Sequence, residues 1–495
     1  MGPHRQHAAV IPMALQGILL GAYCGLWHAA KPLLRRHKRL KEGFDRRLVP
    51  NDWLPGDWVS AGIHAPSPPT DSPHHRIWIQ AASGGEARLV QSFLPELAKA
   101  FQNEPDFSGH GLSLLCTTCT RQGLDVLHSI PVPTGAAPSS LRLVPEYFPL
   151  DRPDLMRKAL RLAAPELIIL LETELWPGLL TAAKEAGIPV IVLNARMTEK
   201  SRKAYFLTRK LWAALAPAAV LAIAEDDAKR FSEVFNLGND VVGVMPNIKF
   251  DVTAAALQAD GHDTRPLARE AALLPSQCRV AALASVREEE EQDMLTVASF
   301  LQTHASRSAA SGPLLVALAP RHMHRVNVWE QTLSRNGIPY IRRTQQKCDT
   351  RIYSGDKGFG VVLWDTFGEL PRLYAAADAV FVGGSLAPLG GQNFLEPLGK
   401  GVIPLVGPHL SNFSWVGDEL FTLGLARRVD NAKELGAKLL DALTGAGLAQ
   451  NPEHSTESSP EQAASAIRRR FAAWLHSRTG GARQAAALAL SFLSR

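Results

Sequence analysis

In the first half of the chain, carboxylate side chains follow two apolar runs, and a carboxylate in such a position could act as a base. Glu86 ends the string Ser83-Gly84-Gly85-Glu86, directly after the run Ile77–Ala81. The glycines permit a tight turn, and the helical pattern that follows would point backbone N–H groups toward a ligand. Glu86 is therefore either a base or cation ligand, or a solvated first-turn glutamate favoured by the helix dipole.

Two more carboxylates, Glu172 and Glu174, follow the apolar run Leu167–Leu171. Burying an unpaired carboxylate is costly, so each needs a partner. The sequence leaves three alternatives: they bind substrate hydroxyls, they pair with Arg196, or they belong to an internal polar network.

An arginine follows an apolar run in the second half. Pro320 and Arg321 come directly after Leu314–Ala319, and the string Asp365–Leu370 follows a further run. The guanidinium fork of Arg321 suits a phosphate or carboxylate, although a surface salt bridge is the alternative.

A glycine-rich segment follows the run Ala379–Val382. It contains Gly383-Gly384-Ser385 and Gly390-Gly391, and it leads to Glu396. A strand, a glycine-rich loop and a helix start could cradle a phosphate, with Glu396 accepting bonds from ribose hydroxyls. A tight structural turn is the alternative. Neither the dinucleotide fingerprint nor a Walker loop is present.

The elements that must position these residues are short apolar runs separated by helical stretches. Runs that are apolar throughout indicate parallel strands covered on both faces, and two such series predict two doubly wound α/β lobes, with a hinge near 245–265. The expected strands are Ile77–Ala81, Leu112–Thr117, Leu167–Leu171, Val190–Leu193 and Val220–Ile223, then Val280–Leu283, Leu314–Leu318, Val361–Leu363, Ala379–Val382 and Ile403–Val406. Two helices are expected near the end, over Ala463–Trp474 and Ala485–Leu493.

The net charge of +6 is located at the amino terminus. Residues 1–50 hold nine Lys/Arg and two Asp/Glu, so the remaining 445 residues are nearly neutral. A basic nucleic-acid groove is therefore not expected. Five cysteines indicate a reducing compartment, and Cys116 and Cys119 are either small buried residues or a metal or redox pair. The sixteen histidines show no ligand spacing, so we expect no catalytic metal.

An uncharged run of 23 residues, Ala8 to Ala30, precedes the basic block 31–41. As a helix it would extend about 34 Å, against a hydrocarbon core of about 30 Å. It is a spanning anchor, a helix lying in the interface, or a soluble core helix. The first two place the body at a membrane whose lipid surface is anionic, and the basic block favours its cytoplasmic side.

Taken in order, these strings resemble the 3-deoxy-D-manno-octulosonic acid (Kdo) transferase family. The resemblance covers nearly the whole chain and is carried by "WIQAASGGEA", "YFPLD", "ETELWP", "NARMTEKS", "NIKFD", "ASVREEEE", "APRH", "DTFGELPRLYAAAD" and "FVGGSLAPLGGQNFLEPLGKGVIPLVGPH". Three departures from the family pattern involve four residues: Gln392 and Arg287 stand where His is usual, and Met245-Pro246 stand where Thr-Gly is common.

The resemblance implies a GT-B glycosyltransferase of lipopolysaccharide biosynthesis, with two Rossmann-like lobes facing across a cleft. The donor would be CMP-Kdo and the acceptor the lipid A precursor (lipid IVA), with inversion and without a metal or other cofactor. Glu86 would be the general base, and Ser83, Gly85, Glu172, Glu174 and Arg196 would lie on the acceptor side. The CMP contacts would fall on Pro320, Arg321, Phe367, Gly368, Glu369, Asn393, Phe394, Leu395 and Glu396.

The expected domains are a membrane anchor (1–34), an acceptor lobe (35–245), a donor lobe (246–450) and a linker with C-terminal helices (451–495). Two alternatives remain open. One is another GT-B enzyme, such as a nucleotide-sugar epimerase, and the other is a membrane-tethered protein that binds a nucleotide sugar without turnover.

Overall fold

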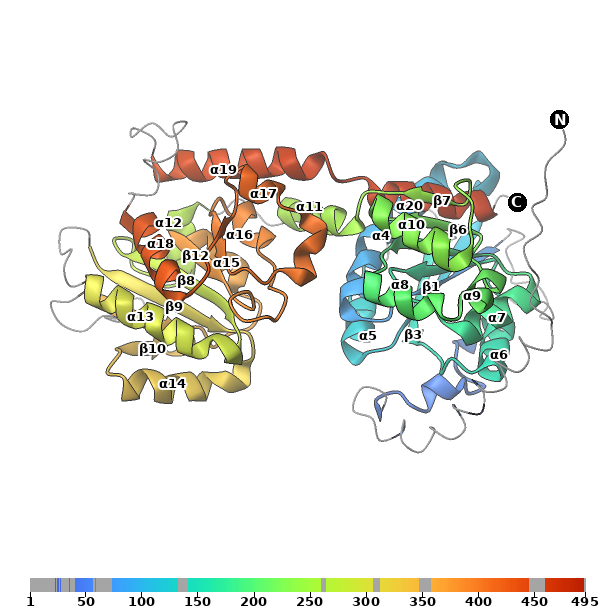
Figure 1. Cartoon of the computed structure of the whole chain (residues 1–495), viewed down its shortest axis with the longest axis horizontal. Helices are drawn as coiled ribbons and strands as arrows, with labels where there is room; N and C mark the ends of the chain where they lie inside the picture. Colours follow the sequence, from blue (N-terminus) through green and yellow to red (C-terminus); the bar gives the residue numbers. More distant parts are fainter. Residues whose placement is uncertain are drawn as a thin grey trace. The chain divides into compact units, whose positions relative to one another are not determined.

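The chain forms two compact units (Figure 1). The computed structural model describes residues 41–56, 74–131, 141–259, 264–305, 312–346, 358–444 and 459–493, with 23, 25, 27, 35 and 58. Unit 1 consists of the described residues up to Ala255 and from Arg478 onward, and unit 2 is Ala256–Ser477. Residues 246–255 thus group with unit 1, and the expected C-terminal segment divides between the two units.

Unit 1 is built on a parallel sheet with the strand order β3-β2-β1-β4-β5-β6-β7. Strands β1 to β3 are added toward one edge of the sheet and β4 to β7 toward the other, so the strand order reverses between β1 and β4, as in a doubly wound fold. The strands are β1 (His74–Gln80), β2 (Gly111–Thr118), β3 (Leu141–Tyr147), β4 (Leu167–Leu171), β5 (Val190–Ala195), β6 (Ala219–Ala222) and β7 (Val242–Val244). The prediction of a parallel doubly wound unit is confirmed here.

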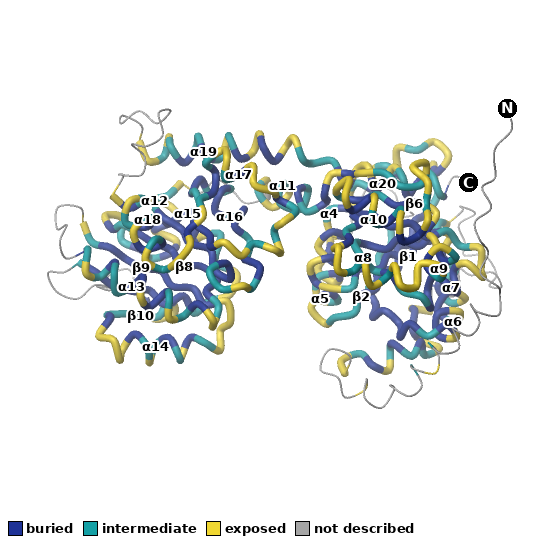
Figure 2. Tube along the Cα trace, in the orientation of Figure 1, coloured by how far each residue is buried: buried dark blue, intermediate teal, exposed yellow. Residues whose placement is uncertain are grey.

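Helices surround this sheet, and alternate strand residues enter two different cores. All five residues of β4 are buried: Ile168 and Leu170 pack in one core, while Leu167, Ile169 and Leu171 pack in the other. The neighbouring strands β1 and β2 are likewise mostly buried (Figure 2). The helices are α4 (Gly84–Asn103), α5 (Arg121–His128), α6 (Pro153–Ala163), α7 (Pro177–Ala186), α8 (Glu199–Phe206), α9 (Arg209–Ala214), α10 (Glu225–Phe235), α11 (Ile248–Ala259) and α20 (Gly481–Leu493).

The last helix, α20, completes the core of unit 1. It packs against α4, and its buried residues belong to the same core cluster as Ile77, Ile79 and Val90. These residues are Ala482, Ala485, Ala486, Ala489, Leu490 and Leu493. Gly481 lies so close to α11 that an added Cβ would stand 2.0 Å from the carbonyl oxygen of Pro246.

Unit 2 contains a second parallel sheet, with the order β10-β11-β9-β8-β12-β13-β14. Its strands are β8 (Arg279–Val286), β9 (Leu314–Pro320), β10 (Tyr340–Arg342), β11 (Phe359–Leu363), β12 (Ala379–Val382), β13 (Pro404–Val406) and β14 (Arg427–Arg428). Its helices are α12 (Arg265–Ala271), α13 (Glu291–Ala305), α14 (Val326–Arg335), α15 (Leu370–Ala376), α16 (Leu395–Gly399), α17 (Glu419–Thr422), α18 (Ala432–Thr444) and α19 (Pro460–His476).

The expected anchor, residues 1–34, lies outside the described residues except for Tyr23, Gly25 and Trp27. Within the described chain, no helix is both long enough and apolar enough to cross a bilayer. Tyr23 and Trp27 contact unit 1: the Tyr23 hydroxyl donates to Asp151 Oδ2 at 2.7 Å, and Trp27 packs against the core.

Candidate functional site

The chemistry-bearing residues lie at the switch point of each sheet. In unit 1 they follow β1 and β4, and in unit 2 they follow the four neighbouring strands β11, β9, β8 and β12. Ligands of open α/β sheets bind outside the carboxyl ends of the strands at such points. We therefore describe the two groups in turn.

Glu86 lies in the first turn of α4 and is buried, with 9% of its surface exposed. Ser83, which is exposed, caps the helix: its N–H donates to Glu86 Oε2 at 2.5 Å, and its hydroxyl accepts from the Glu86 N–H at 3.4 Å. Gly85 is exposed beside them. Burial raises the pKa of Glu86, with Glu172 adding to the rise and Lys249 opposing it. Glu86 is thus not the solvated glutamate of the alternative interpretation, and the rise makes it a stronger base.

Glu172 is ion-paired with Lys249, a residue that the sequence analysis did not select. Lys249 Nζ lies 2.6 Å from Glu172 Oε1, and both side chains are largely buried. Glu172 has a positive φ of 59°, which is strained for a residue with a Cβ and is typical of functional sites. The signal for Lys249 was the string "NIKFD", which places a lysine at the start of α11.

Glu174 is the second carboxylate near Glu86. It accepts a hydrogen bond from Trp176 Nε1 at 2.7 Å. Burial, reinforced by the negative charge of Glu86, raises the pKa of Glu174 to about 8. A pKa of about 8 favours the protonated form of Glu174 at neutral pH.

A buried chain of hydrogen bonds ends at Glu174. Trp78 Nε1 donates to Thr117 Oγ1 at 2.7 Å, and Thr117 Oγ1 donates to Gln80 Oε1 at 2.5 Å. The bond from Thr117 orients the Gln80 side-chain amide, so that the amide nitrogen of Gln80 faces Cys119 Sγ and Glu174. Cys119 is a free thiol, and burial raises its pKa to about 12, so its environment does not favour the thiolate.

The segment after β5 positions Lys249. Asn194, at a positive φ of 53°, accepts a hydrogen bond from the Ile248 N–H at 2.8 Å and thereby fixes the start of α11. Arg196 is half-buried, and its carbonyl accepts a hydrogen bond from the Thr173 hydroxyl. The strings around Glu86, Glu172, Asn194 and Lys249 therefore converge. Glu172 forms an ion pair with Lys249, which was not among the partners that the sequence offered.

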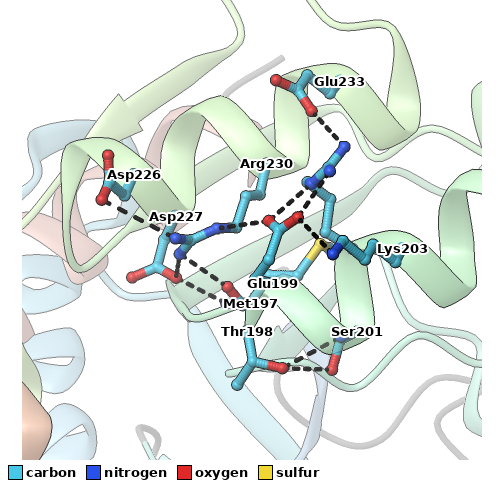
Figure 3. A network of polar contacts seen from close by, with 10 residues as sticks. Met197, Thr198, Glu199, Ser201, Lys203, Asp226, Asp227, Arg230 and Glu233 are labelled. Carbon is cyan, nitrogen blue, oxygen red and sulfur yellow. Dashed lines mark hydrogen bonds and ion pairs between the residues drawn. The ribbon is translucent and has the colours of Figure 1, made fainter.

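The remainder of the string "NARMTEKS" is held by α10 (Figure 3). Asp227 Oδ1 accepts the Met197 N–H at 2.9 Å, and Arg230 donates to the Met197 carbonyl at 3.0 Å. Thr198 caps α8, and Glu199 lies between Arg230 and Lys203. The role of this network is structural: it fixes the backbone on the carboxyl side of Arg196.

In unit 2, Pro320 is buried at the end of β9 and Arg321 is exposed directly after it. The Arg321 N–H donates to the Val286 carbonyl at 2.8 Å. Burial raises the pKa of Tyr374; Glu396 adds to this rise and Arg321 opposes it, so both charges lie near this hydroxyl. The structure therefore brings Arg321 and Glu396 to one end of the sheet.

The other predicted nucleotide contacts differ in what they can offer. Asn393 Nδ2 donates to Glu396 Oε1 at 2.9 Å, and its Oδ1 accepts the Leu395 N–H at 3.2 Å. Phe394 and Leu395 are buried, so their side chains are not available to a ligand.

The string around Phe367 follows β11. Phe367 is 83% exposed, and Gly368 has a φ of +84° that favours glycine. Glu369 accepts from the Thr366 hydroxyl at 2.7 Å and lies 3.5 Å from Arg343. The exposed ring of Phe367 can stack on a base, while Glu369 is held in place.

Two of the positions that depart from the family pattern are accommodated by the fold. Met245 is buried in the core of unit 1, and its Sδ accepts the Asn194 N–H at 3.3 Å. Pro246 packs against Gly481. Among the described residues, no three His, Cys, Asp or Glu side chains form a group that could hold a metal ion.

A family model and curated relatives with similar sequences name the same family. The family model described as 3-deoxy-D-manno-octulosonic-acid transferase (kdotransferase) matches residues 59–252. A 3-deoxy-D-manno-octulosonic acid transferase of Bordetella pertussis is 33% identical over 77% of this chain and 81% of its own. A 3-deoxy-D-manno-octulosonic acid transferase of Chlamydia pneumoniae is 28% identical over 76% of this chain and 79% of its own.

Two solved structures are also similar. The C-terminal CMP-Kdo binding domain of WaaA from Acinetobacter baumannii is 22% identical, with a TM-score of 0.33, over 45% of this chain and 97% of its own. A UDP-GlcNAc 2-epimerase from Neisseria meningitidis is 12% identical, with a TM-score of 0.49. The match covers 84% of this chain and 99% of that protein.

Proposed function

Because the chain belongs to the 3-deoxy-D-manno-octulosonic acid transferase family, we propose that it transfers Kdo from CMP-Kdo to the lipid A precursor (lipid IVA) during lipopolysaccharide assembly. The observation that carries the proposal is the group formed by Glu86, Glu172 and Lys249. It joins a buried carboxylate of raised pKa to an ion pair at the switch point of unit 1.

Glu86 is the general base. As the acceptor hydroxyl oxygen forms its bond to the anomeric carbon of Kdo, its proton passes to the Glu86 carboxylate. The bond between that carbon and the CMP phosphate breaks, so the transfer is a single inverting displacement. Positioned proton transfer of this kind contributes about 10²–10⁴-fold to a rate. The charge of Lys249 opposes the rise in the pKa of Glu86.

Unit 2 binds the donor. Arg321 and the backbone N–H groups after Gly391 stabilise the charge that grows on the CMP phosphate, so no metal is required for this step. Glu396, held by Asn393, accepts bonds from the ribose hydroxyls. Phe367 stacks on the base beside Gly368 and Glu369, and the buried Pro320, Phe394 and Leu395 fix the backbone next to Arg321 and Glu396.

The enzyme works at the cytoplasmic face of the inner membrane, where a lipid-embedded acceptor meets a soluble donor. The apolar run and the basic block near the amino terminus support attachment to an anionic lipid surface. The contacts of Tyr23 and Trp27 with unit 1 favour a helix that lies in the interface over one that leaves the body to cross the bilayer.

Replacing Glu86 with Gln tests the mechanism. We expect transfer from CMP-Kdo to lipid IVA, measured by mass spectrometry of the lipid product, to fall by about 10²–10⁴-fold. CMP binding, measured by calorimetry, remains unchanged because the nucleotide binds unit 2. Glu96→Gln, on the same helix, is the matched control and keeps wild-type turnover.

Near-normal turnover in Glu86→Gln contradicts the mechanism. Turnover of a nucleotide sugar without any lipid acceptor points instead to an epimerase. CMP binding by a wild-type protein that modifies no lipid points to a binding protein.

A further inference from the structure

Four consecutive glutamates follow β8, and one of them is fully buried. Glu290 has no exposed surface, whereas Glu288 and Glu289 are exposed and Glu291 pairs with Arg325 at 2.6 Å. Burial of a charged carboxylate is costly unless its environment compensates the charge. The partners of Glu290 are therefore informative.

In the described part of the chain, the Glu290 carboxylate is bound by backbone N–H groups. Oε2 accepts from Gly384 at 2.6 Å and from Arg287 at 3.3 Å, and Oε1 accepts from Ser385 and Leu386, both at 2.9 Å. Within the described chain no lysine or arginine side chain forms an ion pair with it. Converging N–H dipoles thus take the place of a cation, as they do around bound anions.

Glu290 occupies the cradle that the sequence analysis assigned to a phosphate. Three successive N–H groups at the end of β12 are already bound to it. Gly383 cannot carry a side chain there, because a Cβ would lie 2.9 Å from Glu290 Oε2 and 2.7 Å from the Ser285 carbonyl oxygen. The first part of the glycine-rich loop is therefore built around an internal anion.

The second part of the loop, from Gly390 onward, is hydrogen-bonded to the first part, Gly383–Leu386. The Gly391 N–H donates to the Gly384 carbonyl at 2.6 Å, and the Gln392 N–H donates to the Gly383 carbonyl at 3.2 Å. The residues that Glu290 fixes thus hold the start of the segment that carries Asn393 and Glu396.

We infer that Glu290 is a positioning residue of the donor site: it fills the anion cradle after β12 and sets the loop's shape. The donor phosphate is thereby left to Arg321 and to the part of the loop after Gly391. This inference rests on the proposed function, because it takes unit 2 as the unit that binds the donor.

Hydrogen–deuterium exchange of the wild-type enzyme, read at single residues, tests the inference without any variant. We expect the amides of Gly384, Ser385 and Leu386 to exchange slowly in the ligand-free enzyme and to be unaffected by added CMP. Fast exchange in the ligand-free enzyme, or strong slowing of these amides by CMP, overturns the inference.

Glu290→Gln tests the consequence for catalysis. A carboxamide presents one accepting oxygen, so at least one loop N–H group faces an NH₂ group instead. We expect the KM for CMP-Kdo to rise by about tenfold or more, because bonds to a charged acceptor are lost. The kcat and the KM for the lipid acceptor change little.

Two further variants complete this test. Glu289→Gln makes the same chemical change at the neighbouring exposed residue and keeps wild-type constants. Glu290→Asp keeps a carboxylate and recovers part of the donor affinity. Wild-type constants in Glu290→Gln overturn the inference, and if that variant does not fold, Glu290→Asp and the exchange of the wild-type amides decide.

The two proposals fail in different ways. If the wild-type enzyme binds no CMP, the proposed donor site is wrong, while the exchange of the ligand-free amides still decides whether Glu290 holds the loop. If the wild-type enzyme binds CMP and Glu290→Gln binds it equally well, the donor site stands and the role of Glu290 is wrong.

Discussion

At the scale of single residues, three glutamates of similar sequence context differ in their surroundings. Glu172 pairs with Lys249, Glu86 is buried beside that pair, and Glu174 is protonated near neutral pH. The sequence predicted the roles of carboxylates at these strand ends but not this difference. The difference depends on burial and on a lysine more than 70 residues away in the chain, and neither is a local property.

Glu174 gives the stability of unit 1 a pH dependence. Its pKa is raised from an ordinary value near 4.5 to about 8, so the folded state binds a proton that the unfolded state releases between these values. The stabilisation is complete below the lower value and is lost as the pH rises through the upper one. In denaturant unfolding, we expect Glu174→Gln to reduce the loss of stability between about pH 6 and pH 9 by more than about 1 kcal/mol.

The exposed Glu225→Gln is the control and should keep the wild-type pH profile. A Glu174→Gln profile parallel to that of the wild type would show that this carboxyl group is ionised throughout the range.

At the scale of elements, the strands predicted from the sequence are the inner ones, which have a neighbouring strand on both sides. Ten runs coincide with observed strands, whereas β3, β7, β10 and β14, which the analysis did not name, are the four sheet edges in the described chain. Inner strands are apolar throughout because both faces are covered. An edge strand such as β3 mixes Arg142, Pro145 and Glu146 with apolar residues, so its pattern resembles that of a loop.

Part of the candidate site was predictable for the same reason. Glu86, Arg321 and Glu396 directly follow inner strands or the loops after them, so locating the strands located these residues. Lys249 and Glu290 could not be selected, because their roles depend on partners brought together by the tertiary fold. Phe394 was selected as a contact although its side chain lies in the core.

The buried Asp151, from the string "YFPLD", holds the start of α7. Its Oδ2 accepts from the Gly178 N–H at 2.8 Å and its Oδ1 from the Leu179 N–H at 2.7 Å. Asp151→Ala would leave both buried donors unsatisfied. We expect it to lower the free energy of unfolding of unit 1 by about 1–3 kcal/mol, as measured by denaturant unfolding.

Asp154→Ala removes an exposed carboxylate from the neighbouring helix and should cost less than about 0.5 kcal/mol. Equal effects of the two substitutions would show that Asp151 contributes no more than a surface residue.

At the scale of the whole molecule, the chain passes between the units twice, because α19 belongs to unit 2 and α20 to unit 1. Ala486 of α20 is fully buried in the core of unit 1, while Ala487 beside it is exposed. We expect Ala486→Asp to lower the stability of unit 1 by about 3 kcal/mol or more, because it buries an unpaired charge. In scanning calorimetry of the full chain, with one transition for each unit, the transition of unit 1 should occur at a lower temperature than in the wild type.

Ala487→Asp makes the same chemical change on the exposed face and should alter neither transition by more than about 0.5 kcal/mol. A shift of the unit 2 transition in Ala486→Asp would contradict the assignment of α20 to unit 1.

The return of α20 also sets an order of events during translation. A ribosome adds about 5–20 residues per second, so tens of seconds separate the emergence of α11 from that of the helix that closes the first core. Throughout that interval the nascent first half carries an open apolar surface over α4, while the second half can already be folding. The half of the protein that is synthesised first is therefore the last to be finished.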